Sequence, residues 1–228
     1  MFIFFVILSL YFFLRYTIND IRYTKFLWLS AFFASFSQLV RPPGILLAIA
    51  LGTFVIWQGY QKKSIQYILS FYPLLLVPLT LLGTFYFFNL QFGDFFAYFH
   101  SGDNIHLTFP PFQVFNINQY WVGTIWLEDV IYVFILGLLA GVLLIKQKLL
   151  PLAFFLLTYL FASMLVAHRD IGRYTLPIFP FVLIAFEKIL VSKEFRIVLA
   201  IVALAIYLYS QNFILQNTAP VADLSVYD

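Results

Sequence analysis

The chain has 228 residues, of which 63% are hydrophobic and only 10% are charged. This composition excludes an ordinary soluble domain and predicts an all-α protein, a polytopic bundle of transmembrane helices over residues 1–228 as a single domain. Because the sequence contains no cysteine, disulfide bonds and thiolate metal sites are also excluded. The net charge of +3 gives no indication of nucleic-acid binding, and we expect no nucleic-acid partner.

Apolar runs long enough to cross a hydrocarbon core of roughly 30 Å recur along the chain. They predict about eight spans, at Met1–Tyr16, Phe26–Val40, Ile45–Tyr60, Ile65–Phe88, Ile125–Ile145, Leu149–Ala167, Tyr174–Leu190 and Ile197–Phe213. The second and third runs are short, and the Pro42-Pro43 pair between them also fits one broken or re-entrant element. The later spans contain Pro73, Pro78, Pro177 and Pro180. We expect these prolines to kink their helices without ending them, because neighbouring helices can satisfy the freed carbonyls.

Basic residues divide unevenly between the two faces of this arrangement. One face receives Arg15, Arg22, Lys25, Lys62, Lys63, Lys146, Lys148, Lys188, Lys193 and Arg196. By the positive-inside rule this face is cytoplasmic, which places both termini outside and predicts a multi-pass integral membrane protein. Its location would be the plasma membrane of a prokaryote or the endoplasmic reticulum of a eukaryote. Arg41, Arg169 and Arg173 fall on the outer face against this bias, so we expect them to bind an anion at the membrane surface.

The same outer face carries one long loop, from about Asn89 to Thr124, which contains no lysine or arginine. Its many aromatic residues suit a position at the lipid headgroups better than a disordered chain. Inside the loop, the segment Gly93–His100 has helix-like spacing, with Asp94 placed to cap it.

Four ionisable side chains dominate this loop, namely Asp94, His100, Asp103 and His106. Their spacing matches no strong pattern of metal ligands, so we predict no metal site and no cofactor. We expect His106 to have a structural or hydrogen-bonding role. Beside an anion site, Asp94, Asp103 and His100 are candidate catalytic residues, because such groups can orient or deprotonate an acceptor hydroxyl.

The segment His168–Tyr174 places a histidine, an aspartate and two arginines between two apolar runs. A membrane protein keeps such groups where they face protein or water, which indicates a functional site; the alternative is a polar loop that needs charge to stay in water. A guanidinium stays protonated and forms bidentate hydrogen bonds with phosphate, so Arg41, Arg169 and Arg173 are the candidate substrate-binding residues. Tyr174 either adds a hydroxyl to this site or anchors the chain at the interface.

Three motifs resemble elements of multi-span glycosyltransferases of the GT-C type. These are Arg41-Pro42-Pro43-Gly44, the segment from Gly93-Asp94 to His100, and Gly172-Arg173-Tyr174 followed by Pro177 and Pro180. The chain is most similar to PIG-V-like mannosyltransferases, and the resemblance covers most of its length. It implies the transfer of a sugar, mannose above all, from a polyprenyl-phosphate donor to a glycan or glycolipid acceptor at the non-cytoplasmic face of the lipid bilayer.

The chain departs from the GT-C pattern at its beginning. Enzymes of this type usually carry an acidic catalytic motif in the first external loop, and no such loop precedes the first predicted span. We therefore expect the C-terminal part of a longer enzyme, inactive alone without a missing N-terminal segment that carries the acidic motif. Two alternatives remain: a transporter or flippase of a lipid-linked or anionic solute, favoured by the broken helix at Pro42-Pro43, and a non-catalytic membrane subunit.

Overall fold

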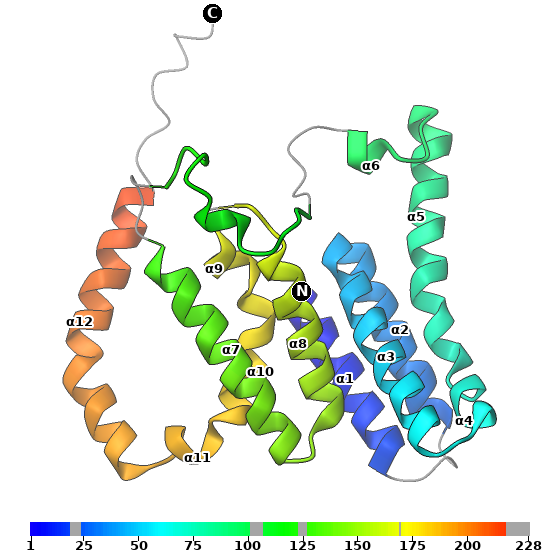
Figure 1. Ribbon diagram of the computed structural model, residues 1–228, viewed down its shortest axis with the longest axis horizontal. Helices are drawn as coiled ribbons and strands as arrows, with labels where there is room; N and C mark the ends of the chain where they lie inside the picture. The colour runs from blue at the N-terminus through cyan, green and yellow to red at the C-terminus, as the bar shows by residue number, and fades with distance from the viewer. Residues whose placement is uncertain (19–23, 101–106, 123–126, 169, 218–228) are drawn as a thin grey trace, which may run out of the picture. The chain divides into compact units, whose positions relative to one another are not determined.

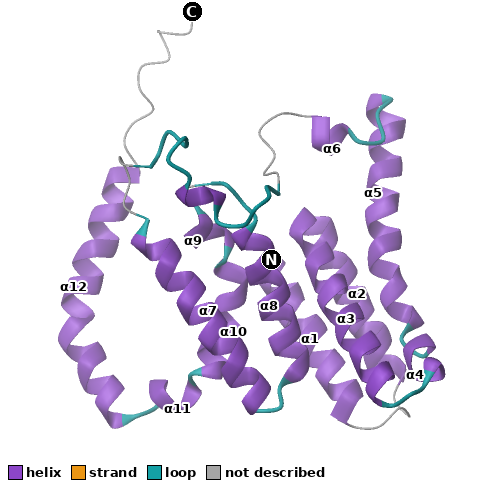
Figure 2. Cartoon of the chain, in the orientation of Figure 1, coloured by secondary structure: helices purple, strands orange, loops and turns teal. Residues whose placement is uncertain are grey.

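The computed structural model describes residues 1–228 except 19–23, 101–106, 123–126, 169 and 218–228. Every regular element in the described part is helical, and the one β-bridge that the structure records there is isolated, between Leu107 and Val166 (Figure 2). The predicted all-α class is therefore confirmed. The chain forms two compact units, Met1–Ala185 (unit 1) and Phe186–Asp228 (unit 2).

Unit 1 contains most of the helices (Figure 1). In chain order they are α1 (Phe2–Ile18), α2 (Thr24–Val40), the 3-10 turn η1 (Pro42–Gly44), α3 (Ile45–Gln61), α4 (Ile65–Leu69), η2 (Tyr72–Leu75), α5 (Leu76–Phe92), α6 (Ala97–His100), η3 (Gln113–Phe115), α7 (Glu128–Lys146), α8 (Leu150–Met164), α9 (Ile171–Tyr174), η4 (Leu176–Ile178) and α10 (Phe179–Ala185). Unit 2 contains α11 (Glu187–Leu190) and α12 (Lys193–Asn217).

Four helices in the described residues are long and apolar enough to cross a membrane, which indicates a membrane protein. They cover Pro42–Gln61, Tyr72–Phe92, Glu128–Lys146 and Lys193–Asn212. Three shorter apolar helices cover Phe2–Ile18, Leu150–Met164 and Leu176–Ala185. The full set of eight spans stays a prediction.

Two of the predicted proline kinks are interruptions instead. Pro73 lies in η2, between α4 and α5, and Pro177 lies in η4, between α9 and α10. A proline has no N–H to donate to the carbonyl four residues earlier, and Pro180 removes a second such bond close to Pro177. The backbone tightens into a 3-10 turn there, so the seventh predicted span is not one continuous helix. Pro78, in contrast, lies inside the continuous helix α5.

Helices of unit 1 approach closely where their facing residues are small. The hydroxyl of Ser9 in α1 donates to the carbonyl of Ser30 in α2 at 2.9 Å, which joins the two antiparallel helices at their middle. A Cβ added to Gly141 of α7 would lie 2.5 Å from the Leu157 side chain of α8. Small residues at such contacts let helix backbones come close together. The closer approach increases van der Waals packing, which helps to hold helices together inside a bilayer, where the hydrophobic effect does not.

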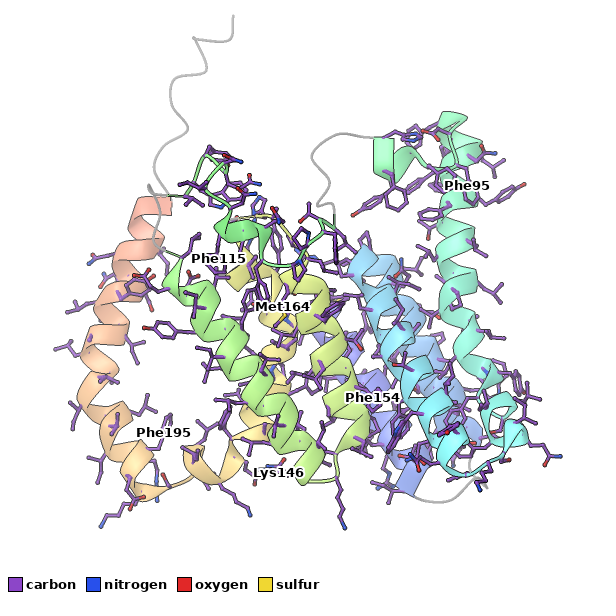
Figure 3. The ribbon with its side chains drawn as sticks, in the orientation of Figure 1. Phe95, Phe115, Lys146, Phe154, Met164 and Phe195 are labelled. Carbon is purple, nitrogen blue, oxygen red and sulfur yellow. The ribbon has the colours of Figure 1, made fainter. Side chains whose placement is uncertain are left out.

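The two ends of unit 1 differ in charge. We call the end where α2, α5 and α8 finish the loop end, and the opposite end the lysine end (Figure 1). The described basic residues of the lysine end are Arg15, Lys25, Lys62, Lys63, Lys146 and Lys148, whereas the loop end has Arg41 and Arg173. Lys146 marks the lysine end in Figure 3. The helices of unit 1 thus bring together the basic groups that the sequence assigns to one membrane face.

This charge distribution predicts the orientation of unit 1 in the membrane. Because lysines are retained on the cytoplasmic side, a cysteine placed at Gln61 should react with an impermeant maleimide only after cells are permeabilised. A cysteine placed at Asn118, an exposed residue of the loop end, should react in intact cells. The chain has no cysteine of its own, so unsubstituted protein is the control. The reverse labelling pattern would contradict the orientation.

Candidate functional site

Arg41 stands at the turn between α2 and α3. Its N–H donates to the Ser37 carbonyl at 3.1 Å, and its own carbonyl accepts from the Gly44 N–H at 2.9 Å. The backbone is extended at Arg41, with φ of −151°, and Pro42 and Pro43 then start the 3-10 turn η1. The sequence Arg-Pro-Pro-Gly folds in this way because the residue before a proline favours extended backbone.

The side chain of Arg41 is exposed, and its charge also acts on a buried tyrosine of unit 1. The described residues contain no carboxylate that forms an ion pair with its guanidinium. Its field acts on the hydroxyl of Tyr159, a residue of α8 that is only 5% exposed. A guanidinium without a carboxylate partner is available for an anionic ligand.

Arg173 lies in the short helix α9 and is paired within its own segment. Its Nη2 lies 2.8 Å from Oδ2 of Asp170 and 3.4 Å from the Tyr174 hydroxyl. The hydrogen bond with Tyr174, and then the charge of Asp170, raise the pKa of Arg173 above its already high ordinary value. Arg173 therefore carries its positive charge at every physiological pH, but an incoming anion must compete with Asp170.

Aromatic rings cover the segment before α9. The ring of His168 lies 5.2 Å from that of Tyr174 and 6.3 Å from that of Trp121, measured between ring centroids. Nδ1 of His168 accepts the N–H of Asp170 at 3.0 Å. Tyr174 thus contacts both Arg173 and His168. These contacts are compatible with both predicted roles, a hydroxyl added to the site and an anchor at the membrane interface.

Part of the long predicted loop packs on the end of α8. The N–H groups of Thr108 and Phe112 donate to the carbonyls of Leu165 and Met164 at 2.7 and 2.8 Å. Trp121, which is 5% exposed, donates from its indole nitrogen to the Val114 carbonyl at 2.8 Å. Figure 3 labels Phe115 of this stretch and Met164 at the end of α8. The aromatic residues therefore order this stretch by burial and hydrogen bonds.

Asp94 and His100 form a close pair just beyond α5. Gly93 ends that helix in the left-handed conformation, with φ of 69°, and turns the chain back. Asp94 then accepts the Phe96 N–H through Oδ1 at 2.9 Å, which is the capping role predicted from the sequence. Its Oδ2 lies 2.7 Å from Nδ1 of His100.

The pairing with His100 lowers the pKa of Asp94 below its ordinary value, and the bond from the Phe96 N–H lowers it further. A depressed carboxyl pKa means that the pair stabilises this turn at neutral pH and loses that effect as the pH falls through the lowered pKa. Asp94 is therefore ionised at physiological pH. A base this weak is suited to holding an imidazole in place more than to removing a proton itself.

Replacing His100 should reverse this shift. We expect His100→Ala to raise the pKa of Asp94 toward the ordinary aspartate value, because the largest cause of the depression is gone. The carboxyl carbon shift of Asp94, followed against pH by NMR in detergent micelles, measures it. His168→Ala is the matched control and should leave the titration unchanged. An unchanged titration in His100→Ala would show that the two side chains are not paired.

The structure joins some of the predicted site residues and leaves others apart. Asp94 contacts His100, and Arg173 contacts Tyr174, whereas Arg41 lies on a different turn of the loop end. Asp103, His106 and Arg169 lie outside the described residues. Within the described part of the chain, no three histidine, aspartate or glutamate side chains come close enough to hold a metal ion.

Sequence reasoning missed three residues at the loop end. Gln38 is buried beneath the Arg41 turn, and Tyr159 is the phenol that the charge of Arg41 reaches. Asp129 lies against α9, since its Oδ2 would be 3.1 Å from a Cβ added to Gly172. Of these three, only Gln38 could have been found from the sequence. It lies four residues after Ala34 and seven after Ala31, which places it on the same helix face as these two buried small residues.

Two hollows in the surface of unit 1 lie near the lysine end. Gly59, Tyr60 and Lys63 belong to the lining of one, and Lys25 and Trp28 to that of the other. Neither lining contains a predicted site residue. The polar groups of the loop end are therefore the candidate site because of their chemistry, and not because of a deep pocket.

Comparisons with protein-family models, with curated proteins and with solved structures found no match to this chain. The function has to be inferred from the chemistry of the loop end itself. That chemistry consists of two arginines, an aspartate–histidine pair and a cover of aromatic rings.

Proposed function

We propose that this protein is a membrane glycosyltransferase of the GT-C type that moves a sugar, mannose above all, from a polyprenyl-phosphate donor to a hydroxyl of a glycan or glycolipid. The protein spans the membrane several times, and the transfer takes place at the non-cytoplasmic face of that membrane. The observation that carries the proposal is the position of Arg41 and Arg173 at the loop end, away from the lysines and arginine of the opposite end. Cations placed against the positive-inside bias need a reason other than topology.

The two arginines would act on the phosphate of the donor. A polyprenyl tail lies among apolar helices, and its phosphate lies at the interface, at the level where these helices end. When the bond between sugar and phosphate breaks, negative charge grows on the leaving phosphate. Guanidinium groups fixed beside it stabilise this charge, and they do so more strongly in the transition state than in the bound donor. Arg41, which has no carboxylate partner among the described residues, can accept the phosphate without a competing ion pair.

The Asp94–His100 pair would act on the acceptor. Asp94 engages Nδ1 of His100, which leaves Nε2 as the atom that takes a proton from an acceptor hydroxyl. The carboxylate stabilises the imidazolium that forms, as it does in other aspartate–histidine pairs. Asp103 remains a further candidate for orienting the acceptor or the donor.

The test is an in vitro transfer assay with labelled polyprenyl-phosphate mannose in membranes that contain this chain or a form extended upstream. We expect labelled acceptor with the wild type of an active form, and a strong loss in Arg41→Ala. Lys62→Ala, at the lysine end, is the matched charge control and should transfer at the parental rate. Transfer by the extended form alone would support the expectation that this chain is part of a longer enzyme. Absence of transfer by both forms, or equal rates in both variants, would contradict the proposal.

A transporter or flippase of the same lipid is the second candidate. The helix interruptions at η1, η2 and η4 favour it, because transporters bind anionic groups at broken helices. Movement of polyprenyl-phosphate mannose across the bilayer of liposomes, without any labelled acceptor, would support this function instead. A non-catalytic subunit would show neither transfer nor movement.

A further inference from the structure

Gln38 is a buried amide whose hydrogen bonding is incomplete. Its residue is 5% exposed, and its Oε1 is buried without a hydrogen-bond partner in the described part of the chain. Buried polar atoms in folded proteins nearly always have such a partner, so an exception needs an explanation. The neighbouring buried serines of α2 are satisfied: Ser35 donates to Ala31 at 2.9 Å, and Ser37 donates to Ala34 at 2.7 Å.

The Arg41 turn holds Gln38 in place. Gly44 packs directly on α2, so closely that an added Cβ would lie 2.4 Å from the backbone nitrogen of Gln38. Arg41 follows Gln38 by three residues, and its N–H donates to the Ser37 carbonyl at 3.1 Å, so the turn begins directly at the end of α2 that carries Gln38. The end of α2 and the turn that follows it thus carry, within four residues of chain, a buried acceptor oxygen and a guanidinium whose charge acts on Tyr159.

The chemistry of an unpaired Oε1 restricts what it can bind. This oxygen accepts a hydrogen bond, so its partner must supply an O–H or N–H group. The phosphate of a polyprenyl-phosphate sugar is a diester that is ionised at neutral pH and carries no proton to donate. The sugar of the same donor carries several hydroxyl groups. A ligand that satisfies both Arg41 and Gln38 therefore has an anionic group and a hydroxyl close together, as a glycosyl phosphate does.

We propose that Gln38 is a specificity-determining residue that accepts a hydrogen bond from a hydroxyl of the donor sugar, while Arg41 binds the donor phosphate. This inference rests on the proposed function, because it names how the same donor is recognised. Gln38 distinguishes a sugar-bearing carrier from the bare polyprenyl phosphate. The arginines bind the phosphate that both lipids share.

The experiment compares two lipids on the purified full chain in detergent. Thermal unfolding is measured with polyprenyl phosphate and with polyprenyl-phosphate mannose, for wild type, Gln38→Leu, Gln38→Met and Ser37→Ala. We expect wild type to bind the mannose-bearing lipid about tenfold more tightly than the bare lipid, the size of one neutral hydrogen bond. Both Gln38 variants should bind the two lipids equally, at the affinity of wild type for the bare lipid. Ser37→Ala should keep the wild-type preference, because its hydroxyl is already bonded inside the helix.

The unbound proteins separate a binding role from a structural one. Leucine and methionine at position 38 remove an unsatisfied polar atom, so both variants should unfold at or above the wild-type temperature without lipid. Retained preference for the mannose-bearing lipid in both variants would overturn the role of Gln38 and leave the proposed function intact. Equal binding of the two lipids by wild type would also overturn the role of Gln38. If wild type is stabilised by neither lipid, the proposed function itself fails.

Discussion

Arg173→Ala should reduce sugar transfer by about 10²–10³-fold, the usual effect of removing one electrostatic stabiliser of a developing charge. The Arg173 side chain is 66% exposed and lies at the loop end, and its guanidinium contacts Asp170 and Tyr174. Its charge persists because a guanidinium stays protonated at physiological pH. The measurement is the rate of transfer from labelled polyprenyl-phosphate mannose, at matched protein abundance in membranes.

Lysine at position 173 separates geometry from charge. Arg173→Lys keeps the charge but loses the planar fork that binds two phosphate oxygens, so transfer should still fall markedly. Asp170→Asn removes the ion-pair partner at 2.8 Å, and it should leave donor binding equal or tighter because the phosphate no longer competes with a carboxylate. Lys193→Ala, in a residue that the charge pattern assigns to the cytoplasmic side, should have no effect. A parental rate in Arg173→Ala would mean that the residue is only a loop charge.

Gly44→Ala should destabilise unit 1 by about 3 kcal/mol, at the upper end of what overpacking costs. The added Cβ would lie 2.4 to 2.6 Å from backbone atoms of Ser37 and Gln38, and backbone cannot move aside as a flexible side chain can. Gly44 has φ of −58°, an ordinary helical value, so the substitution adds no torsional strain. The cost is therefore purely steric. Unfolding in mixed micelles, followed by circular dichroism, measures it.

Gly52→Ala is the matched control within α3, because a Cβ at that position meets nothing within 4 Å. It should be neutral, or stabilising by about 0.5–1 kcal/mol through the higher helix propensity of alanine. If Gly44→Ala unfolds like Gly52→Ala, then η1 does not pack on α2 as the structure has it. The Arg41 turn would then lose its support against the backbone of Ser37 and Gln38.

Long apolar runs determined much of this protein by themselves. In a bilayer, a long and mostly apolar run has to form its backbone hydrogen bonds within its own helix, so the predicted spans at Met1–Tyr16, Phe26–Val40 and Ile45–Tyr60 agree closely with α1, α2 and α3. The separation of the basic residues from Arg41 and Arg173 was also visible in the sequence, because helices that run up and down bring alternate loops to the same end. Both results depend on local pattern and length alone.

Only the tertiary structure decided how the polar groups pair. Asp94 meets His100 because the chain turns at Phe96, whose N–H Asp94 accepts, and then enters α6; a separation of six residues by itself does not specify that contact. The seventh predicted span breaks at η4 because closely spaced prolines leave carbonyls unpaired, which hydropathy does not register. Gln38 reads as one polar residue in an apolar helix until the packing of Gly44 on α2 shows it buried with an unpaired oxygen. The burial of Gln38 depends on how the turn after α2 folds back on that helix, so it follows from packing in three dimensions and not from the pattern of residues along the chain.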